Sequence, residues 1–272
     1  MDFPQIIPHS DGAGTIDAVG EGVSASLIGK RVWTINGQWK RPFGTAAEFI
    51  ALPDSQVGML PENLSTETGA SLGIPLLTAW YATQACGGLL GKTVLVYGAT
   101  GAVGSYATQL AARSGARVIG VAGSKDRCER ALGLGAEWVI DRSEDDVVAS
   151  VRECTGGIGV DAIIEVDAAA NAGNYGSLLK FGGDVIIYGS GASSIAVPFR
   201  PMIVGFANLR FFIVYNLPLQ VRRAGLDVLT PMLEKGELQH SPTETFALSE
   251  IAVAHERVEA GANAKILVDL RR

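Results

Sequence analysis

The sequence predicts an α/β fold built around a doubly wound parallel sheet. From residue 93 onward, short apolar runs of strand length alternate with segments whose apolar residues recur at helical spacing. Strands that alternate with helices form right-handed βαβ units, which place helices on both faces of one parallel sheet. The predicted strands span residues 93–97, 117–122, 138–140, 161–166, 184–188 and 209–214, and the predicted helices span residues 103–114, 126–134, 145–154 and 219–233.

The first 60 residues follow a different pattern, in which Gly, Pro and β-branched residues form short runs. Residues 66–86 are rich in Ala and Leu and predict a helix interrupted at Pro75, because proline lacks the backbone N–H. Further strands are expected over residues 14–20, 30–35, 46–52 and 265–268. We therefore predict a β-rich domain of residues 1–79 with 216–272 and a second domain of residues 80–215.

Composition narrows the classes of function. The chain has 272 residues, 47% of them hydrophobic, and a formal net charge of −6 without a long basic run, which argues against nucleic-acid and membrane partners. Its three cysteines show no CxxC spacing, so neither a disulfide framework nor a structural zinc site is expected. The start resembles no signal peptide, and no apolar stretch is long enough to cross a membrane. We expect a cytoplasmic protein.

A glycine-rich loop lies between the first predicted strand and helix of the second domain. Small residues allow the backbone to approach a pyrophosphate, which the free N–H groups of the following helix can bind. The glycines read G-x-x-G-x-x-G, with Ala99 at the first glycine of the usual motif, and a plain turn is the other interpretation. The strand–turn–helix context favours a Rossmann-type dinucleotide site. The residues are Gly98, Ala99, Thr100, Gly101, Ala102, Val103 and Gly104.

The end of the next strand indicates which dinucleotide binds. NAD sites usually carry a carboxylate there for the ribose 2′-hydroxyl, but this chain has Ser124 and Lys125, with Arg127 shortly after. A hydroxyl and two cations suit a 2′-phosphate, so NADP(H) is predicted. Asp126 opposes this interpretation unless it serves as a helix N-terminal acid, and a solvated helix start is the less favoured interpretation of the two cations.

Taken in order, these residues resemble the medium-chain dehydrogenase/reductase superfamily, and within it the zinc-independent quinone oxidoreductases (the zeta-crystallin-like group). The likeness extends over nearly the whole chain. It is carried by residues 8–14 with 19–23, 44–49, 72–80, 98–104, 132–141 and 254–268. The resemblance implies that the β-rich part is a GroES-like catalytic domain beside the Rossmann-type domain.

The resemblance also implies roles for single residues. Thr78 would lie near the nicotinamide ribose, although a buried helix-capping hydroxyl is the alternative. Arg142 would make a second contact to the 2′-phosphate or adenine, although a surface cation is the alternative. Lys265 is a further candidate. The remaining implied contacts are Tyr188, Gly189 and Ser190 along the cofactor, and the backbone from Phe212 to Val214 at the carboxamide.

No metal is expected. Zinc-dependent relatives carry a histidine just before a glycine-rich turn, whereas this chain has Ser10 there and His9 shifted by one position. His9 is therefore expected to be a polar loop residue. Family members begin with several strands ahead of the motif at residues 8–14, so the front of the catalytic domain is expected to be missing.

The implied function is NADPH-dependent hydride transfer to a quinone or α,β-unsaturated carbonyl without zinc, and no catalytic residue can be named. The alternatives are a non-catalytic NADPH-binding protein, a zinc-type alcohol dehydrogenase and an enoyl-thioester reductase relative. The resemblance also implies a homodimer formed through the Rossmann domain. Residues 209–219 could form the interface edge, but a buried strand explains their apolar character equally well.

Overall fold

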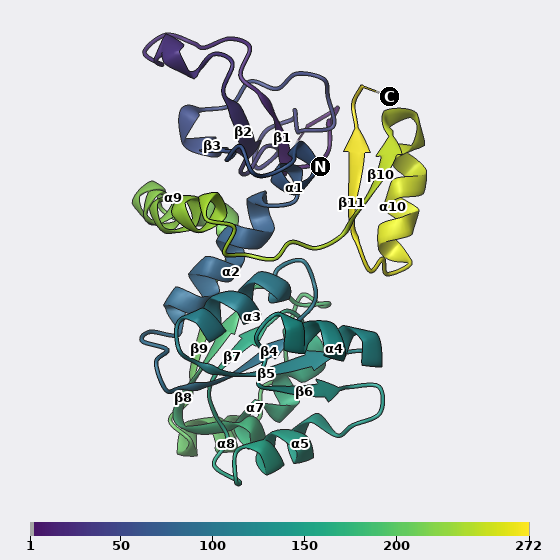
Figure 1. The fold of residues 1–272 in the computed structure, drawn as a ribbon. Helices are drawn as coiled ribbons and strands as arrows, with labels where there is room; N and C mark the ends of the chain where they lie inside the picture. The colour runs from purple at the N-terminus through teal and green to yellow at the C-terminus, as the bar shows by residue number, and fades with distance from the viewer. Residues whose placement is uncertain (1–2, 272) are drawn as a thin grey trace. The chain divides into compact units, whose positions relative to one another are not determined.

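In the computed structural model, which describes residues 3–271, the middle of the chain forms one six-stranded parallel sheet (Figure 1). Its strand order is β6-β5-β4-β7-β8-β9, so successive strands are added on one side of β4 up to β6 and on the other side from β7 onward. This is the order of a doubly wound dinucleotide-binding fold, and the predicted fold class is confirmed. The strands are β4 (Thr93–Tyr97), β5 (Arg117–Ala122), β6 (Trp138–Asp141), β7 (Val160–Glu165), β8 (Leu179–Ile187) and β9 (Asn208–Phe211).

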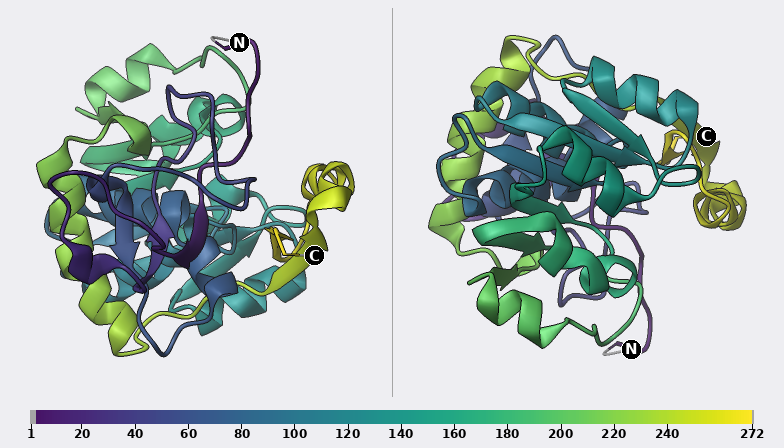
Figure 2. Two further views of the ribbon diagram at one scale, coloured as in Figure 1. Left: turned by 90° about the horizontal axis from the view of Figure 1, so that it is seen from above. Right: turned by 90° about the horizontal axis from the view of Figure 1, so that it is seen from below.

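Helices cover both faces of this sheet, and this explains why its central strands are apolar along their whole length. Figure 1 shows α3 and α4 on one face and α5, α7 and α8 on the other, and Figure 2 shows the second face from below. Leu95, Ile119 and Ile163 are fully buried in the resulting core. The helices are α3 (Gly104–Arg113), α4 (Lys125–Gly133), α5 (Val147–Cys154), α6 (Ala168–Asn171), α7 (Tyr175–Leu178) and α8 (Phe199–Val204).

The chain divides into two compact units. Unit 1 combines Met1–Leu77 with Leu217–Arg272, and unit 2 is the continuous segment Thr78–Asn216 that contains the parallel sheet. Unit 1 has an antiparallel sheet in the order β1-β2-β3 and a separate parallel pair, β10 and β11. Its elements are β1 (Gly12–Thr15), β2 (Arg31–Thr34), β3 (Val57–Met59), α1 (Thr66–Ala70), α9 (Leu219–Glu234), β10 (Thr243–Ala247), α10 (Ile251–Glu259) and β11 (Lys265–Asp269).

The predicted strand over residues 46–52 is wrong. The backbone of this region bonds to the chain start instead, with the N–H of Gly44 donating to Ile7 O at 2.8 Å and that of Ala46 to Pro8 O at 3.1 Å. Phe49 is 74% exposed, and no residue of the run is fully buried. The strand of this region is β3, which the sequence analysis missed because Gly58 weakens the strand pattern. Gly58 is needed there, because a Cβ would lie 2.5 Å from the indole of Trp33.

The predicted interruption at Pro75 is also wrong. The break between α1 and α2 (Gly73–Ala85) falls at Ser71 and Leu72. Pro75 lies in the first turn of α2, where an N–H has no helical acceptor in any case. Helix α2 belongs to unit 1 up to Leu77 and to unit 2 from Thr78 onward.

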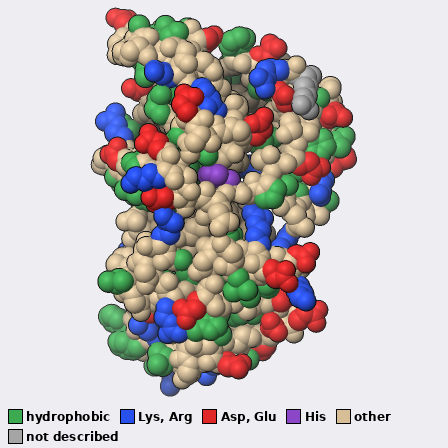
Figure 3. All heavy atoms as spheres, in the orientation of Figure 1, with side chains coloured by type: hydrophobic (Ala, Val, Ile, Leu, Met, Phe, Trp, Pro, Cys, Tyr) green, Lys and Arg blue, Asp and Glu red, His purple; other side chains and the backbone are tan. Residues whose placement is uncertain are grey.

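Charged side chains of both signs are interspersed over the face that Figure 3 shows. This mixture agrees with the modest net charge of −6. Among the residues that the structure describes, no helix combines the length and the apolar character needed to cross a membrane.

Candidate functional site

The glycine loop between β4 and α3 is shaped by two glycines, at which a larger residue would be strained or would displace backbone. Gly98 has a φ of +64°, a left-handed conformation that suits glycine. A Cβ on Gly104 would overlap the carbonyl oxygen of Gly98 and lie 2.8 Å from its carbonyl carbon. The loop is further fixed by the N–H of Gly101, which donates to Gly98 O at 2.8 Å. The start of α3 is therefore drawn tightly against the end of β4.

The amino end of α3 keeps backbone donors available. Within residues 3–271, no protein acceptor bonds the N–H groups of Ala102, Val103 or Gly104, and no side chain caps the helix. Gly101 and Ala102 are exposed, so a ligand can reach these donors. Free N–H groups combined with the positive end of the helix dipole form a site for an anion such as a pyrophosphate.

A second polar group gathers at the end of β5. Ser124 is the N-cap of α4, and its hydroxyl makes no capping bond. The guanidinium of Arg142, which follows β6, lies beside this turn, since a Cβ on Gly123 would be 3.3 Å from its Nε. Lys125 is exposed on the first turn of α4, and Arg127 is half-buried. Asp126 lies in the same first turn, as expected for a helix N-terminal acid.

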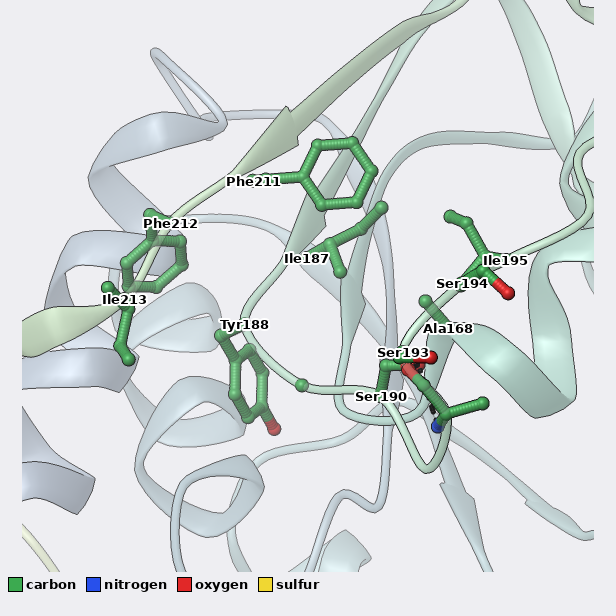
Figure 4. A pocket seen from close by; sticks show the side chains of 12 residues that line it. Ala168, Ile187, Tyr188, Ser190, Ser193, Ser194, Ile195, Phe211, Phe212 and Ile213 are labelled. Atoms are coloured by element: carbon green, nitrogen blue, oxygen red, sulfur yellow. Dashed lines mark hydrogen bonds between the residues drawn. The ribbon is translucent and has the colours of Figure 1, made fainter. Parts of the chain in front are cut away.

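A pocket of about 430 Å³ opens at the carboxyl ends of β8 and β9 (Figure 4). The aromatic side chains of Tyr188, Phe211 and Phe212 lie on one side of it, and a serine-rich loop of residues 190–195 lies on the other. Gly189 lets this loop pass close to the neighbouring strand end, because a Cβ would overlap the carbonyl oxygen of Val166. Three predicted contact residues, Tyr188, Gly189 and Ser190, therefore line one cavity in unit 2.

Thr78 carries a buried hydroxyl that makes no hydrogen bond to any described residue. The residue is 4% exposed and lies in the interior of α2, so the capping interpretation is not supported. A buried polar group without a partner costs free energy. One turn further along α2, the ring of Tyr81 packs on Phe212 with centroids 4.7 Å apart. This part of α2 therefore joins the aromatic side of the pocket.

Two predicted contact residues, Val214 and Lys265, have surroundings that differ from those of the pocket-lining residues. Val214 is buried in a short 3-10 turn of residues 214–216. Lys265 begins β11 in unit 1, where its Nζ lies 3.5 Å from Oδ2 of Asp11. Burial raises the pKa of Asp11, and Lys265 and the N–H of Ile74 partly oppose that rise.

The buried carboxylate of Glu165 at the end of β7 was not predicted from the sequence. It is fully buried and accepts hydrogen bonds from the N–H of Asp167 and the hydroxyl of Tyr175 at 2.6 and 3.0 Å. Burial raises its pKa, against the opposing effect of these donors. The available signal was an acid directly after Ile163 and Ile164 in an apolar strand.

Histidines and acids do not gather in the way that a metal centre requires. Over the described part of the chain, no group of three or more His, Cys, Asp or Glu side chains could hold a metal ion. His9 instead contacts His255, with the two Nε2 atoms 2.8 Å apart.

These features fit a dinucleotide. The backbone of the loop at Gly98 and Gly104 could hold a pyrophosphate, and the turn with Ser124, Lys125 and Arg142 could hold a phosphate on the adenosine ribose. The Thr78 hydroxyl, which has no partner among the described residues, could bond the other end of such a ligand.

Known proteins share this arrangement. The family model for zinc-binding dehydrogenases matches residues 102–229. The quinone oxidoreductase of Sus scrofa is 34% identical over 265 residues, which are 96% of this chain and 79% of that protein. The solved quinone oxidoreductase of Pseudomonas syringae pv. Tomato DC3000 superposes with a TM-score of 0.85 at 27% identity, covering 96% of this chain and 81% of that one.

A mycobacterial structure complexed with NADPH has a TM-score of 0.80 at 26% identity, covering 92% of this chain and 78% of that one. Together with the sheet order and the glycine loop, these similarities confirm the resemblance found in the sequence. The chain belongs to the quinone oxidoreductase group of the medium-chain dehydrogenase/reductase superfamily.

Proposed function

We propose that this protein is an NADPH-dependent reductase of quinones or α,β-unsaturated carbonyls that works without zinc. The observation that carries the proposal is the backbone cradle at Gly98 and Gly104, with free N–H groups at the start of α3. The names of the relatives support the substrate class, and the NADPH-bound neighbour supports the cofactor. The presence of Ser10 where zinc-dependent relatives carry a histidine supports the absence of zinc.

The preference for NADPH over NADH rests on the turn after β5. A 2′-phosphate carries nearly two negative charges and several acceptor oxygens. Arg142 lies against the turn, Lys125 is exposed beside it, and the Ser124 hydroxyl is not used by the helix cap. Arg127, two positions after Lys125 on α4, adds a third cation. Charge-assisted hydrogen bonds of this kind contribute about 1.5–3 kcal/mol each, so loss of one should weaken binding measurably.

The nicotinamide end is proposed to bind at Phe212 and Val214. A carboxamide needs both a donor and an acceptor. The N–H of Phe212 already donates to Ile187 O at 3.1 Å, which leaves the Phe212 carbonyl as an acceptor. The N–H of Val214 has no protein acceptor within residues 3–271, so it can serve as the donor. The Thr78 hydroxyl is proposed to bond the adjoining ribose.

Bound NADPH supplies a hydride for reduction of the electron-poor substrate. The protein's own contribution is orientation and exclusion of water. Tyr188 and Phe212 place aromatic surface beside the pocket, with ring centroids 6.4 Å apart. Burial and the nearby Glu165 raise the pKa of Tyr188, so its hydroxyl stays protonated. No side chain is assigned a proton-transfer step.

The proposed cofactor contacts thus comprise three groups, at the phosphate loop, the adenosine ribose and the nicotinamide end. They are Gly98, Ala99, Thr100, Gly101, Ala102, Val103 and Gly104; then Ser124, Lys125, Arg127 and Arg142; then Thr78, Tyr188, Gly189, Ser190, Phe212 and Val214. Lys265 is the weakest candidate, because its ammonium group already faces Asp11.

We test the proposal by titrating the purified chain with NADPH and NADH while following fluorescence, and then adding a quinone. NADPH should bind more tightly than NADH, and Lys125→Glu should weaken NADPH binding while leaving NADH binding nearly unchanged. NADPH should be oxidised only after the quinone is added. Failure to bind either nucleotide would overturn the proposal, and binding without oxidation would leave a non-catalytic NADPH-binding protein.

We further propose a homodimer that forms at β9. Among the strands of residues 3–271, β9 pairs only with β8 and so leaves one edge of the sheet open. An unpaired strand edge can pair with another strand. In a dimer with a two-fold axis, β9 of each chain would pair with β9 of the other, and the open β9 edges of both chains would be covered. Exposed apolar residues lie near it, with Phe206 69% and Phe211 61% exposed. Analytical sedimentation should give a mass of twice the 28.4 kDa of one chain. The variant Phe211→Lys should sediment with the mass of a single chain.

Location in the cytoplasm is also a proposal. All three cysteines, Cys86, Cys128 and Cys154, are free thiols. Free thiols agree with a reducing compartment. Fractionation of the source cells with an antibody against the chain would test this assignment.

A further inference from the structure

Glu165 combines a buried carboxylate with a set of donors that all come from one short stretch of chain. Its Oε1 accepts from the N–H of Asp167 at 2.6 Å and from Nδ2 of Asn171 at 3.0 Å. Its Oε2 accepts from the hydroxyl of Tyr175 at 3.0 Å. The carboxylate therefore fixes the turn that leaves β7 and the helical segment that follows it.

This turn connects the two loops that are proposed to hold the cofactor. On one side, the side chain of Val166 lies on the glycine loop, since a Cβ on Gly98 would be 3.3 Å from its Cγ1. On the other side, Oδ1 of Asp167 accepts from the N–H of Gly191 at 2.8 Å. The N–H of Ala168 donates to Gly189 O at 3.1 Å. We call residues 166–168 the bridge segment.

Glu165 also holds the pocket loop through its own backbone. The N–H of Tyr188 donates to Glu165 O at 3.1 Å, and Tyr188 is the first residue of the segment 188–195, which we call the pocket loop. The side chain thus stabilises the bridge segment, and the main chain stabilises the first residue of the pocket loop. Both attachments start from one position at the carboxyl end of β7.

Core packing alone does not explain an acid at this position. A fully buried carboxylate is costly unless its oxygens are satisfied, and an aliphatic residue would fill the strand end without that cost. An aliphatic residue would, however, leave the donors of Asp167, Asn171 and Tyr175 without an acceptor. The carboxylate is therefore matched to the donors of the turn and not to the apolar packing of the strand.

We propose that Glu165 is a positioning residue, which holds the bridge segment so that the pocket loop presents Tyr188 to Ser190 to the nicotinamide half of the cofactor. It does not contact the cofactor itself. The inference rests on the proposed function, because it presumes that NADPH binds along these two loops. It predicts a selective effect, in which the nicotinamide half loses affinity while the adenosine half keeps it.

The experiment compares NADPH with adenosine 2′,5′-bisphosphate, which carries the 2′-phosphate but no nicotinamide. In Glu165→Leu, the dissociation constant of NADPH should rise about 10-fold or more, because misplaced contact groups lose affinity steeply. That of the bisphosphate should change by less than about 2-fold. Glu165→Gln keeps an acceptor for the N–H of Asp167 and should restore most of the NADPH affinity.

A matched control lies at the other end of the same strand. Asp161 near the start of β7 is an acid that accepts from the N–H of Thr93 at 2.8 Å and pairs with Lys180. Asp161→Asn should leave the ratio of the two dissociation constants unchanged. A simple loss of stability in the sheet would affect this control in the same way as Glu165→Leu.

Hydrogen exchange of the cofactor-free protein gives a second readout that needs no ligand. Amides of residues 166–171 and 188–191 should exchange faster in Glu165→Leu than in the wild type. If this variant does not fold, Tyr175→Phe and Asn171→Ala each remove one donor and should show the same selective loss to a smaller degree.

The outcomes separate the two proposals. Wild-type protein that binds neither ligand overturns the proposed function. Wild-type protein that binds both, with variants that lose both affinities equally or neither, overturns the role of Glu165 alone.

Discussion

The imidazole rings of His9 and His255 meet at their Nε2 atoms, which lie 2.8 Å apart. Only one of these nitrogens can carry the shared proton, so the contact requires at least one neutral ring. Burial, His255 and the ammonium group of Lys265 all lower the pKa of His9. His9 also has a φ of +74°, a conformation that non-glycine residues seldom adopt. This contact joins the loop before β1 to α10 within unit 1.

This lowered pKa predicts that stability falls in mild acid. The unfolded chain binds a proton at His9 near its ordinary value of about 6.5, whereas the folded chain binds it only at lower pH. Stability is therefore fully present above that value and is lost as the pH falls through the folded pKa. Thermal unfolding between about pH 8 and about pH 5 should show this decline, and His9→Gln should make it smaller. Some decline should remain in the variant, because burial also lowers the pKa of His240. A decline of equal size in the variant would contradict the assignment.

Gly104→Ala should damage both the fold and the cofactor site. The added methyl group would overlap Gly98 O, so α3 must move away from β4. Overpacking of this kind costs about 1–3 kcal/mol of unfolding free energy. NADPH binding should also weaken, because the N–H groups at the helix start move with it. Gly133→Ala is the control, since a Cβ at that helical position meets nothing within 4 Å.

Thr78→Val should have opposite effects on stability and on binding. The hydroxyl is buried without a protein partner, so replacing it with a methyl group should stabilise the cofactor-free protein by about 1 kcal/mol. NADPH should nevertheless bind more weakly, because its ribose loses a hydrogen-bond partner. Denaturant unfolding and fluorescence titration measure the two effects. Equal NADPH affinity in variant and wild type would refute the contact.

Lys265→Met should reduce stability and leave NADPH affinity unchanged. The variant removes the cation beside the buried Asp11. We expect a loss of about 2–3 kcal/mol, less than for a fully buried pair because the lysine side chain is partly exposed. The double variant with Asp11→Asn should recover most of it. A clear loss of NADPH affinity would restore Lys265 as a cofactor contact.

Arg142→Glu should discriminate between the two dinucleotides. Its guanidinium lies at the turn proposed for the 2′-phosphate, so NADPH should bind about 10- to 100-fold more weakly. NADH lacks that phosphate and should bind as before. Arg152→Glu makes the same charge change at the end of α5 and should alter neither affinity. Loss of both affinities would place Arg142 elsewhere in the site.

Features that depend on neighbours in sequence could be predicted. The loop from Gly98 to Gly104 is a local pattern of small residues between a strand and a helix, and the structure has the expected turn there. The alternating strands and helices of unit 2 were predicted for the same reason. The likeness to known relatives added Thr78 and Arg142, which no local pattern marks.

Contacts between distant residues could not be predicted. The partners of Glu165 follow from how the turn after β7 folds back, and nothing in the apolar strand itself specifies them. The error at residues 46–52 has a related cause. The run has strand-like composition, but strand formation also needs an open partner edge, and the N–H of its first residue, Ala46, bonds instead to Pro8 O. Strand β3 could not be predicted because Gly58 weakens its strand pattern. That glycine is required by the indole of Trp33 on the neighbouring strand, which leaves no room for a Cβ.

The interleaving of the two units sets an order for synthesis on the ribosome. Unit 2 is one continuous segment, so it can fold as soon as it leaves the exit tunnel. Unit 1 needs Lys265 to meet Asp11 and His255 to meet His9, across sequence separations of 254 and 246 residues. Contacts this far apart form late and slowly. The nascent chain therefore presents a folded nucleotide-binding unit while its first residues still wait for their partners, and dinucleotide captured at that stage would stabilise the half-made protein.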